Sequence, residues 1–178
     1  MDKLVWRNIG RFVLLTLLQV LVLNYVYMGS YVMPMLYVLF ILMLPTSMGR
    51  VPMLLTAFGT GLVIDLTSCA LGFHALACTV VAMMRITFAD RILTRGEEVT
   101  IPTPSLFSVT PQYFISYLVL LTGAFYLVLY LFEVFSFRGL GSVLLATLAS
   151  TIVTTLLALA YQFVFVRRKN AQELRIKP

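Results

Sequence analysis

Long apolar stretches joined by short polar connections constrain this chain more than any other feature. Six such stretches can be marked, most of them near the roughly 20 residues that a helix needs to cross about 30 Å of hydrocarbon. Because 61% of the 178 residues are hydrophobic and only 11% are charged, a water-soluble domain could not bury the apolar surface. The sequence therefore predicts an all-α polytopic membrane protein, a single six-transmembrane-helix bundle.

The predicted spans cover residues 11–28, 32–44, 52–67, 72–89, 113–135 and 141–166. The second span is short, and Pro34 is expected in its first turn, where the missing N–H is not needed. The fourth helix is expected to run on to Leu93 as an amphipathic end. Residues 94–112 contain three prolines, which predicts an extended cytoplasmic linker, and residues 167–178 form a basic cytoplasmic tail.

The basic residues predict the orientation of the bundle. With six spans, all of the 13 Lys and Arg residues except Arg138 lie on one side, which predicts cytoplasmic N- and C-termini. A re-entrant second stretch would leave five spans and place nine of these residues outside, against the positive-inside rule. Since the basic residues lie at segment ends and not on one face, the sequence does not predict nucleic-acid binding. On the outer side, Glu133 is expected to pair with Arg138.

Asp65 is the most informative single residue, because apolar residues flank it within the third span. A charged side chain at the centre of a span costs roughly 3 kcal/mol or more, so an intramembrane acid needs a partner. One candidate is His74, on the next helix of a hairpin that turns near Ala70. The alternative is the backbone N–H groups of Gly72 and Phe73, where the dipole of the fourth helix favours negative charge. Three roles for Asp65 stay open: proton or ion translocation, a partner or ligand contact, and a structural lock.

The residue types that bind metals or attack substrates do not form a recognisable constellation. His74 and Cys78 are four residues apart on one helix, and Cys69 and Asp65 lie near them in sequence, but the spacing matches no familiar zinc pattern. A nucleophilic cysteine would lack an identifiable base and oxyanion donors. We therefore expect no metal, no cofactor and no catalytic residue.

Small residues recur every four positions along the sixth span, at Ala146, Ser150, Thr154 and Ala158. Such a stripe lets helix backbones approach closely, so it should face protein. The facing helix either belongs to the same chain or to a second copy in a homodimer, with packing inside the chain favoured. The basic tail is expected to contact anionic membrane lipid.

One motif carries a family resemblance. The run 59–77 reads GTGLVIDLTSCALGFHALA, with a glycine, an aspartate–leucine pair, a small residue and a leucine–glycine pair at Gly61, Asp65, Leu66, Ser68, Leu71 and Gly72. This pattern resembles the signature of the bacterial rod shape-determining protein MreD family. The length, the six spans, Pro45 after the second span and the basic tail also agree with that family.

The resemblance implies a non-enzymatic scaffold subunit of the cell-elongation machinery in the bacterial cytoplasmic (inner) membrane. It implies MreC, a single-span membrane protein, as partner, together with MreB filaments, RodA and its penicillin-binding transpeptidase in peptidoglycan synthesis. Asp65, with Gly61, Ser68, Gly72 and His74 around it, would be the partner or ligand contact.

The alternative is a substrate-binding subunit of a vitamin transporter of the energy-coupling-factor type, which is similar in length and helix number. Those subunits dock through an alanine-spaced motif in the first helix. The corresponding run here, FVLLTLLQVLVLNYVY, contains no alanine, which favours the scaffold.

Overall fold

The computed structural model describes residues 2–23, 32–68, 70–93, 104, 110–134 and 140–166. These residues form α-helices α1 (Asp2–Leu21), α2 (Val38–Leu42), α3 (Arg50–Ser68), α4 (Phe73–Leu93), α5 (Pro111–Val134) and α6 (Leu140–Tyr161), and α6 continues into a π-helical turn, Gln162–Val166. Within this described part the chain is all-helical, as the sequence predicts.

Three helices of the described part are long and apolar enough to cross a membrane: Arg50–Ser68, Pro111–Glu133 and Gly141–Phe165, with mean hydropathies of 1.4, 2.1 and 2.2. A shorter apolar helix, Phe73–Phe88, lies within α4. By length and composition, therefore, the chain is a helical membrane protein.

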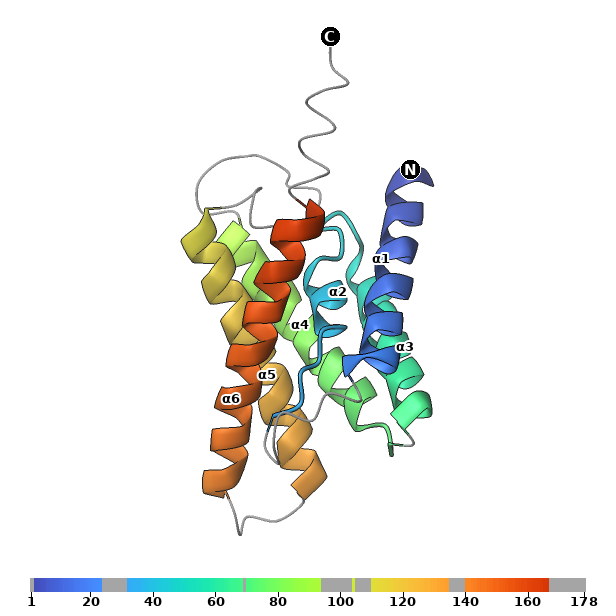
Figure 1. Cartoon of the computed structure of the whole chain (residues 1–178). Helices are drawn as coiled ribbons and strands as arrows, with labels where there is room; N and C mark the ends of the chain where they lie inside the picture. The colour runs from blue at the N-terminus through green and yellow to red at the C-terminus, as the bar shows by residue number, and fades with distance from the viewer. Residues whose placement is uncertain are drawn as a thin grey trace.

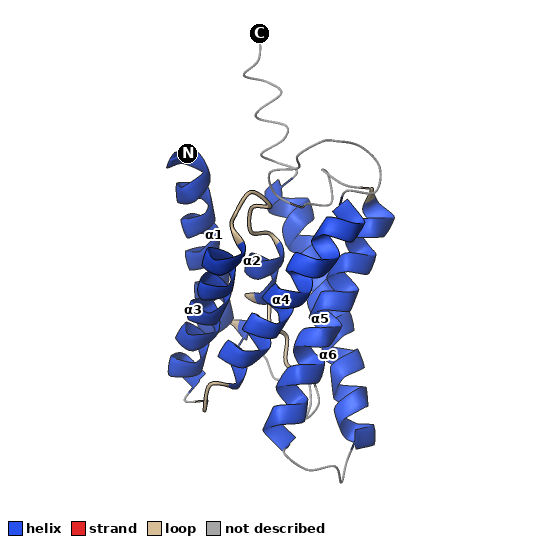
Figure 2. Cartoon of the chain, turned by 180° about the vertical axis from the view of Figure 1, so that it is seen from behind, coloured by secondary structure: helices blue, strands red, loops and turns tan. Residues whose placement is uncertain are grey.

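The helices form two antiparallel pairs, α3 with α4 and α5 with α6, and α4 packs beside α5 (Figures 1 and 2). Helix α1 stands next to α3, and the short α2 lies inside the bundle (Figure 1). The first turn of α1 and the last turn of α6 lie at the same end, opposite the connection between α3 and α4 (Figure 1).

The predicted span over 32–44 differs most from the structure. Its helix covers only Val38–Leu42, and Pro34 precedes that helix instead of lying in its first turn. A residue before proline favours extended backbone, so Met33 and Pro34 keep the helix from starting earlier, and Pro45 follows its end. The continuous helix predicted over 32–44 is thus corrected to an extended stretch followed by a single helix of five residues.

The other predicted spans fit the structure to different degrees. Helix α1 covers Asp2–Leu21, earlier in the chain than the predicted 11–28, while α3, α4, α5 and α6 begin and end within a few residues of their predicted bounds. Helix α4 extends to Leu93, as expected, and α5 begins at Pro111, a residue suited to a first helical turn. Most of the linker 94–112 and the whole tail 167–178 lie outside the described residues.

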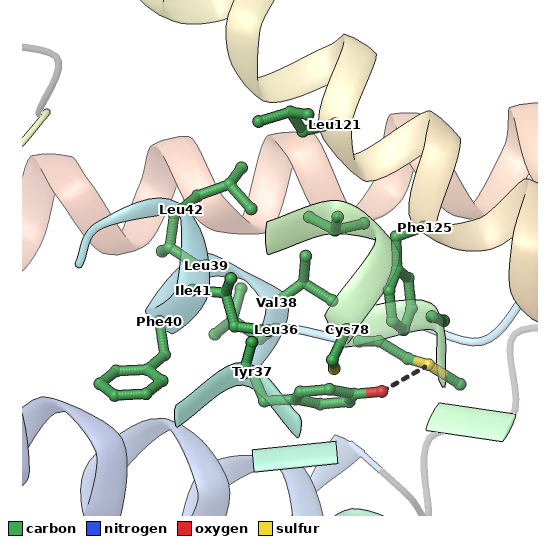
Figure 3. Close-up of a cluster of buried hydrophobic side chains, with 14 of the residues drawn as sticks. Leu36, Tyr37, Val38, Leu39, Phe40, Ile41, Leu42, Cys78, Leu121 and Phe125 are labelled. Atoms are coloured by element: carbon green, nitrogen blue, oxygen red, sulfur yellow. Dashed lines mark hydrogen bonds between the residues drawn. The ribbon is translucent and has the colours of Figure 1, made fainter. Parts of the chain in front are cut away.

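The core surrounds α2 and the residues before it. Every residue in the run 35–44 is at most 8% exposed. Figure 3 shows side chains of this run beside Leu121 and Phe125 of α5 and Cys78 of α4. The ring of Tyr37 meets that of Phe125 edge-on, with centroids 5.8 Å apart. The run 34–44 is therefore an interior segment, here called the interior strut, around which the longer helices pack.

Candidate functional site

The hairpin between α3 and α4 places Asp65 near one end of the bundle. Asp65 lies 15 residues after the start of α3, or about 22 Å along its axis. The carbonyl of Asp65 accepts a hydrogen bond from the N–H of Ala70 at 3.0 Å, which closes the last turn of α3. Gly72 then adopts φ +89°, a left-handed conformation that suits glycine, and its carbonyl opens α4 by accepting from Leu76. The start of α4 is thereby turned back toward Asp65.

The carboxylate of Asp65 is held by the first turn of α4. Oδ1 accepts from the backbone N–H of His74 at 3.2 Å, and Oδ2 accepts from the N–H of Ala75 at 2.9 Å. The His74 ring nitrogen Nδ1 lies 2.9 Å from Oδ1. Beside an ionised carboxylate, which only accepts hydrogen bonds, Nδ1 is the donor of this pair.

Asp65 therefore uses both kinds of partner that the sequence offers, the His74 ring and backbone N–H groups at the start of α4. The side chain of Asp65 is 4% exposed and that of His74 12%. The backbone donors belong to His74 and Ala75, two residues later than the predicted Gly72 and Phe73. Their N–H groups have no acceptor in their own helix, and the positive end of the helix dipole favours a carboxylate there.

Gly61 lets the two helices come close enough for these bonds. A Cβ added at Gly61 would lie 2.3 Å from the Cα of Ala75 and 2.6 Å from the carbonyl oxygen of His74. No side chain of any size fits at that separation. Gly61 and Asp65, one turn apart on α3, thus contact the same turn of α4.

A cavity of about 380 Å³ lies beside this contact. His74 lines it, and Ser68, the exposed last residue of α3, lies at its edge. Residues of the extended stretch form another wall, and Glu133 at the end of α5 completes the polar lining. Arg138, the partner predicted for Glu133, lies outside the described residues.

The other end of the bundle contains a buried charge that the sequence does not reveal. Arg85 of α4 is 1% exposed, and its Nε donates to the Tyr117 hydroxyl at 2.9 Å. Its two terminal nitrogens donate to the carbonyl of Leu44 and to the sulfur of Met53, the latter at 3.1 Å. The sequence places Arg85 at the membrane surface, because arginine after an apolar run usually marks a boundary.

These contacts belong to a set of side chains that satisfy the carbonyl groups after α2. The Tyr117 hydroxyl donates to the carbonyl of Leu42 at 3.1 Å, and Nη1 of Arg11 donates to the carbonyl of Met43 at 3.1 Å. A helix end buried in a bundle needs such partners, since water cannot reach it. Two arginines and a tyrosine supply them here.

The residues before α2 are bonded in the same manner. Gln19 donates to the carbonyl of Pro34 at 3.1 Å and accepts from the N–H of Leu36 at 2.8 Å. The Tyr126 hydroxyl donates to the carbonyl of Met33 at 2.7 Å and accepts from the N–H of Met35 at 2.8 Å. Side chains from α1 and α5 therefore replace the hydrogen bonds that a continuous helix would make.

The small-residue stripe of α6 faces this same stretch. Its four members, Ala146, Ser150, Thr154 and Ala158, are each at most 8% exposed within the single chain. Oγ of Ser150 lies 2.9 Å from the Tyr130 hydroxyl, and Oγ1 of Thr154 lies 2.5 Å from that of Tyr126. The stripe packs inside the chain, against α5 and the residues before α2.

Metal-binding residues do not gather in the described part of the chain, where no three His, Cys, Asp or Glu side chains form a cluster. Cys78 is a buried free thiol, and Cys69 lies outside the described residues. Of Asp65, His74 and Cys78, the structure brings Asp65 and His74 together by hydrogen bonding.

Comparisons with known proteins add no identification to this geometry. No family model, no curated protein and no solved structure matches the chain.

Proposed function

We propose that the chain is a non-enzymatic scaffold subunit of the bacterial cell-elongation machinery, similar to the MreD family, with six membrane crossings and both termini in the cytoplasm. The main support for this proposal is the contact between α3 and α4 made by Gly61, Asp65 and Gly72, here called the clamp. Both Asp65 oxygens accept hydrogen bonds from backbone N–H groups, so the carboxylate joins two helices, which favours a structural role over a catalytic one. The residues of the clamp, Gly61, Asp65 and Gly72, are the residues that carry the family resemblance.

The charge distribution supports the orientation and the inner-membrane location. The first turn of α1, the start of α3 at Arg50 and the end of α6 share one end of the bundle (Figure 1). Basic residues belong on the cytoplasmic side of a membrane, so this end faces the cytoplasm. The clamp and the cavity beside it then face outward.

The proposed partners are MreC through its single membrane helix, and MreB, RodA and the penicillin-binding transpeptidase through further contacts. Several helices, among them α3 and α6, present exposed apolar faces for a partner helix. On α3 the exposed residues include Leu55, Phe58 and Leu62, and on α6 they include Leu148 and Ile152. Both faces repeat at helical spacing, as a lipid-facing or helix-binding surface does.

Purification of the full chain under mild detergent tests the proposal. We expect it to retain a single-span protein with a coiled-coil domain outside the membrane. A photo-crosslinking residue at Leu62 or at Leu148 should form an adduct with that protein, and the same residue at buried Val81, which is 0% exposed, should form none. If neither exposed position yields an adduct, the scaffold function is wrong.

The substrate-binding subunit of a vitamin transporter remains the alternative, and the cavity beside His74 is the observation that favours it. Ligand pockets typically measure about 300 to 1,000 Å³, and this cavity lies in that range. A vitamin retained through purification, or recovery with an ATPase module, would select this alternative over the scaffold.

A further inference from the structure

The cavity beside the clamp is lined by non-helical backbone, which a bundle serving only as a packed scaffold does not need. Non-helical backbone at membrane depth is tolerated only where it is buried in protein or lines a cavity. Here Met33, Met35 and Tyr37, from the extended stretch before α2, form one wall of the cavity. The break in the predicted second span therefore lies at the cavity wall.

The polar lining of the cavity includes hydrogen-bond acceptors, beside the amide of Gln19 and the hydroxyls of Tyr37 and Ser68, which can also donate. With Nδ1 of His74 directed at Asp65, Nε2 is the ring nitrogen left for a ligand, and it makes no hydrogen bond to the described residues. The carboxylate of Glu133 is an acceptor in the lining. Lysine and arginine are absent from the described residues that line the cavity.

The charge near the cavity is negative. Glu133 lines it directly, and Asp65 lies behind His74, 2.9 Å from the ring. A cavity whose described lining contains a carboxylate and no Lys or Arg favours a ligand that brings N–H donors and positive charge together. The remaining walls, which include Leu23, Met33 and Ile64, are apolar and suit an aliphatic chain.

From this arrangement we propose that the cavity binds an aliphatic primary ammonium group, with the cation between His74 and Glu133 and the carbon chain against the apolar walls. A free amine and an ethanolamine lipid headgroup both supply this group. The binding does not depend on the scaffold function, because it requires only the cavity.

Calorimetric titration of the full chain in phosphatidylcholine nanodiscs tests the proposal with n-pentylammonium as probe. A ligand of six heavy atoms with one charge-assisted contact should bind with a Kd of about 1 mM. 1-Pentanol should bind at least about tenfold more weakly, since it lacks the charge. Absence of saturable pentylammonium binding up to about 10 mM would overturn the proposal.

Two variants locate the binding. Glu133→Gln should weaken pentylammonium binding about tenfold by removing the charged acceptor. The matched control is Asp2→Asn, which removes one negative charge at the start of α1, the far end of the bundle, and should leave binding unchanged (Figure 1). Equal binding by all three proteins would place the amine elsewhere and overturn the proposal.

His74→Phe removes Nε2 but keeps the backbone N–H that bonds to Asp65. We expect it to reduce binding by a further factor of about ten in a protein whose thermal unfolding shows that it is folded. Unchanged binding in the folded variant would exclude His74 as an acceptor and overturn the assigned position.

The source of the ammonium is distinguished by three probes. A short peptide with one lysine is compared with its norleucine counterpart, and nanodiscs containing phosphatidylethanolamine are compared with pure phosphatidylcholine. Stronger binding of the lysine peptide would indicate a partner side chain instead and overturn the proposed source. Competition by phosphatidylethanolamine against pentylammonium indicates a lipid headgroup, and binding of pentylammonium without either effect indicates a free amine.

Discussion

Two buried charges, Asp65 and Arg85, stabilise opposite ends of the same bundle by opposite means. The carboxylate accepts backbone N–H groups at the start of α4, and the guanidinium donates to a backbone carbonyl just after α2. The partners of Asp65 lie nine and ten residues away in sequence, whereas those of Arg85 lie 32 and 41 residues away. The first contact can form within a hairpin, and the second requires several helices in place.

This difference means that the two charges have different consequences for the fold. Asp65 joins two consecutive helices that a short turn already connects. Arg85 joins α4 to α5, to the start of α3 and to the end of the interior strut. Loss of Arg85 should therefore affect the whole bundle, and loss of Asp65 mainly the hairpin.

The largest effect is expected from Arg85→Met, which keeps the volume roughly and removes every donor. The carbonyl of Leu44 and the hydroxyl of Tyr117 lose a buried partner, so the free energy of unfolding should fall by about 4 kcal/mol. Unfolding titrations in mixed SDS micelles measure it. Arg85→Lys keeps the charge, but its single ammonium nitrogen cannot occupy the positions of the three guanidinium nitrogens, and we expect it to recover less than half of the loss. An Arg85→Met protein as stable as the wild type would mean that burying the guanidinium costs as much as its bonds contribute.

Asp65→Ala should lower the free energy of unfolding by about 3 kcal/mol, because two backbone N–H groups lose their acceptor. Asp65→Asn retains one oxygen but turns an NH₂ group toward a backbone donor, so about half of that loss should remain. The same SDS titration measures both. Hydrogen exchange should show faster exchange confined to the turn and the first turn of α4. Faster exchange across all helices would mean that loss of Asp65, like loss of Arg85, affects the whole bundle and not mainly the hairpin.

Gly61→Ala tests the close approach that the Asp65 bonds require. The added Cβ would meet the backbone of Ala75, and because backbone cannot move aside cheaply, α3 and α4 must separate. We expect a loss of about 2 kcal/mol in the free energy of unfolding. Gly59→Ala is the matched control, since its Cβ would meet nothing within 4 Å and alanine favours a helix by about 1 kcal/mol. If both variants behave alike, steric contact at Gly61 does not determine the helix separation.

The sequence reveals Asp65 and conceals Arg85 for a physical reason. Asp65 stands between Ile64 and Leu66, where only a special environment tolerates charge. Arg85 follows an apolar run, where a surface arginine and a buried one look the same. The residues that bond to it include Leu44 and Tyr117, from distant segments, so no local pattern identifies them.

The interior strut could not be predicted for a similar reason. An apolar run of thirteen residues satisfies the criteria for a short helix, and its period does not distinguish a helix from buried irregular backbone. Pro34 was the one local signal that the helix starts late. The side chains that replace the missing backbone bonds, Gln19 and Tyr126, lie on α1 and α5 and are identified only by the fold.

The smallest effect should separate polar groups that have partners from those that lack them. Oγ1 of Thr151 is buried on α6 and has no hydrogen-bond partner in the described residues, whereas Oγ1 of Thr154 lies 2.5 Å from the Tyr126 hydroxyl. Valine matches the shape and β-branching of threonine. Thr151→Val should therefore raise the free energy of unfolding by about 0.5 kcal/mol, and Thr154→Val should lower it by about 1 kcal/mol, because only the second leaves a buried hydroxyl with one partner fewer. SDS unfolding titrations of the two variants side by side measure both changes. A loss of equal size in both variants would mean that Thr151 gains a hydrogen bond in the membrane, and that the two threonines of α6 do not differ in having a partner.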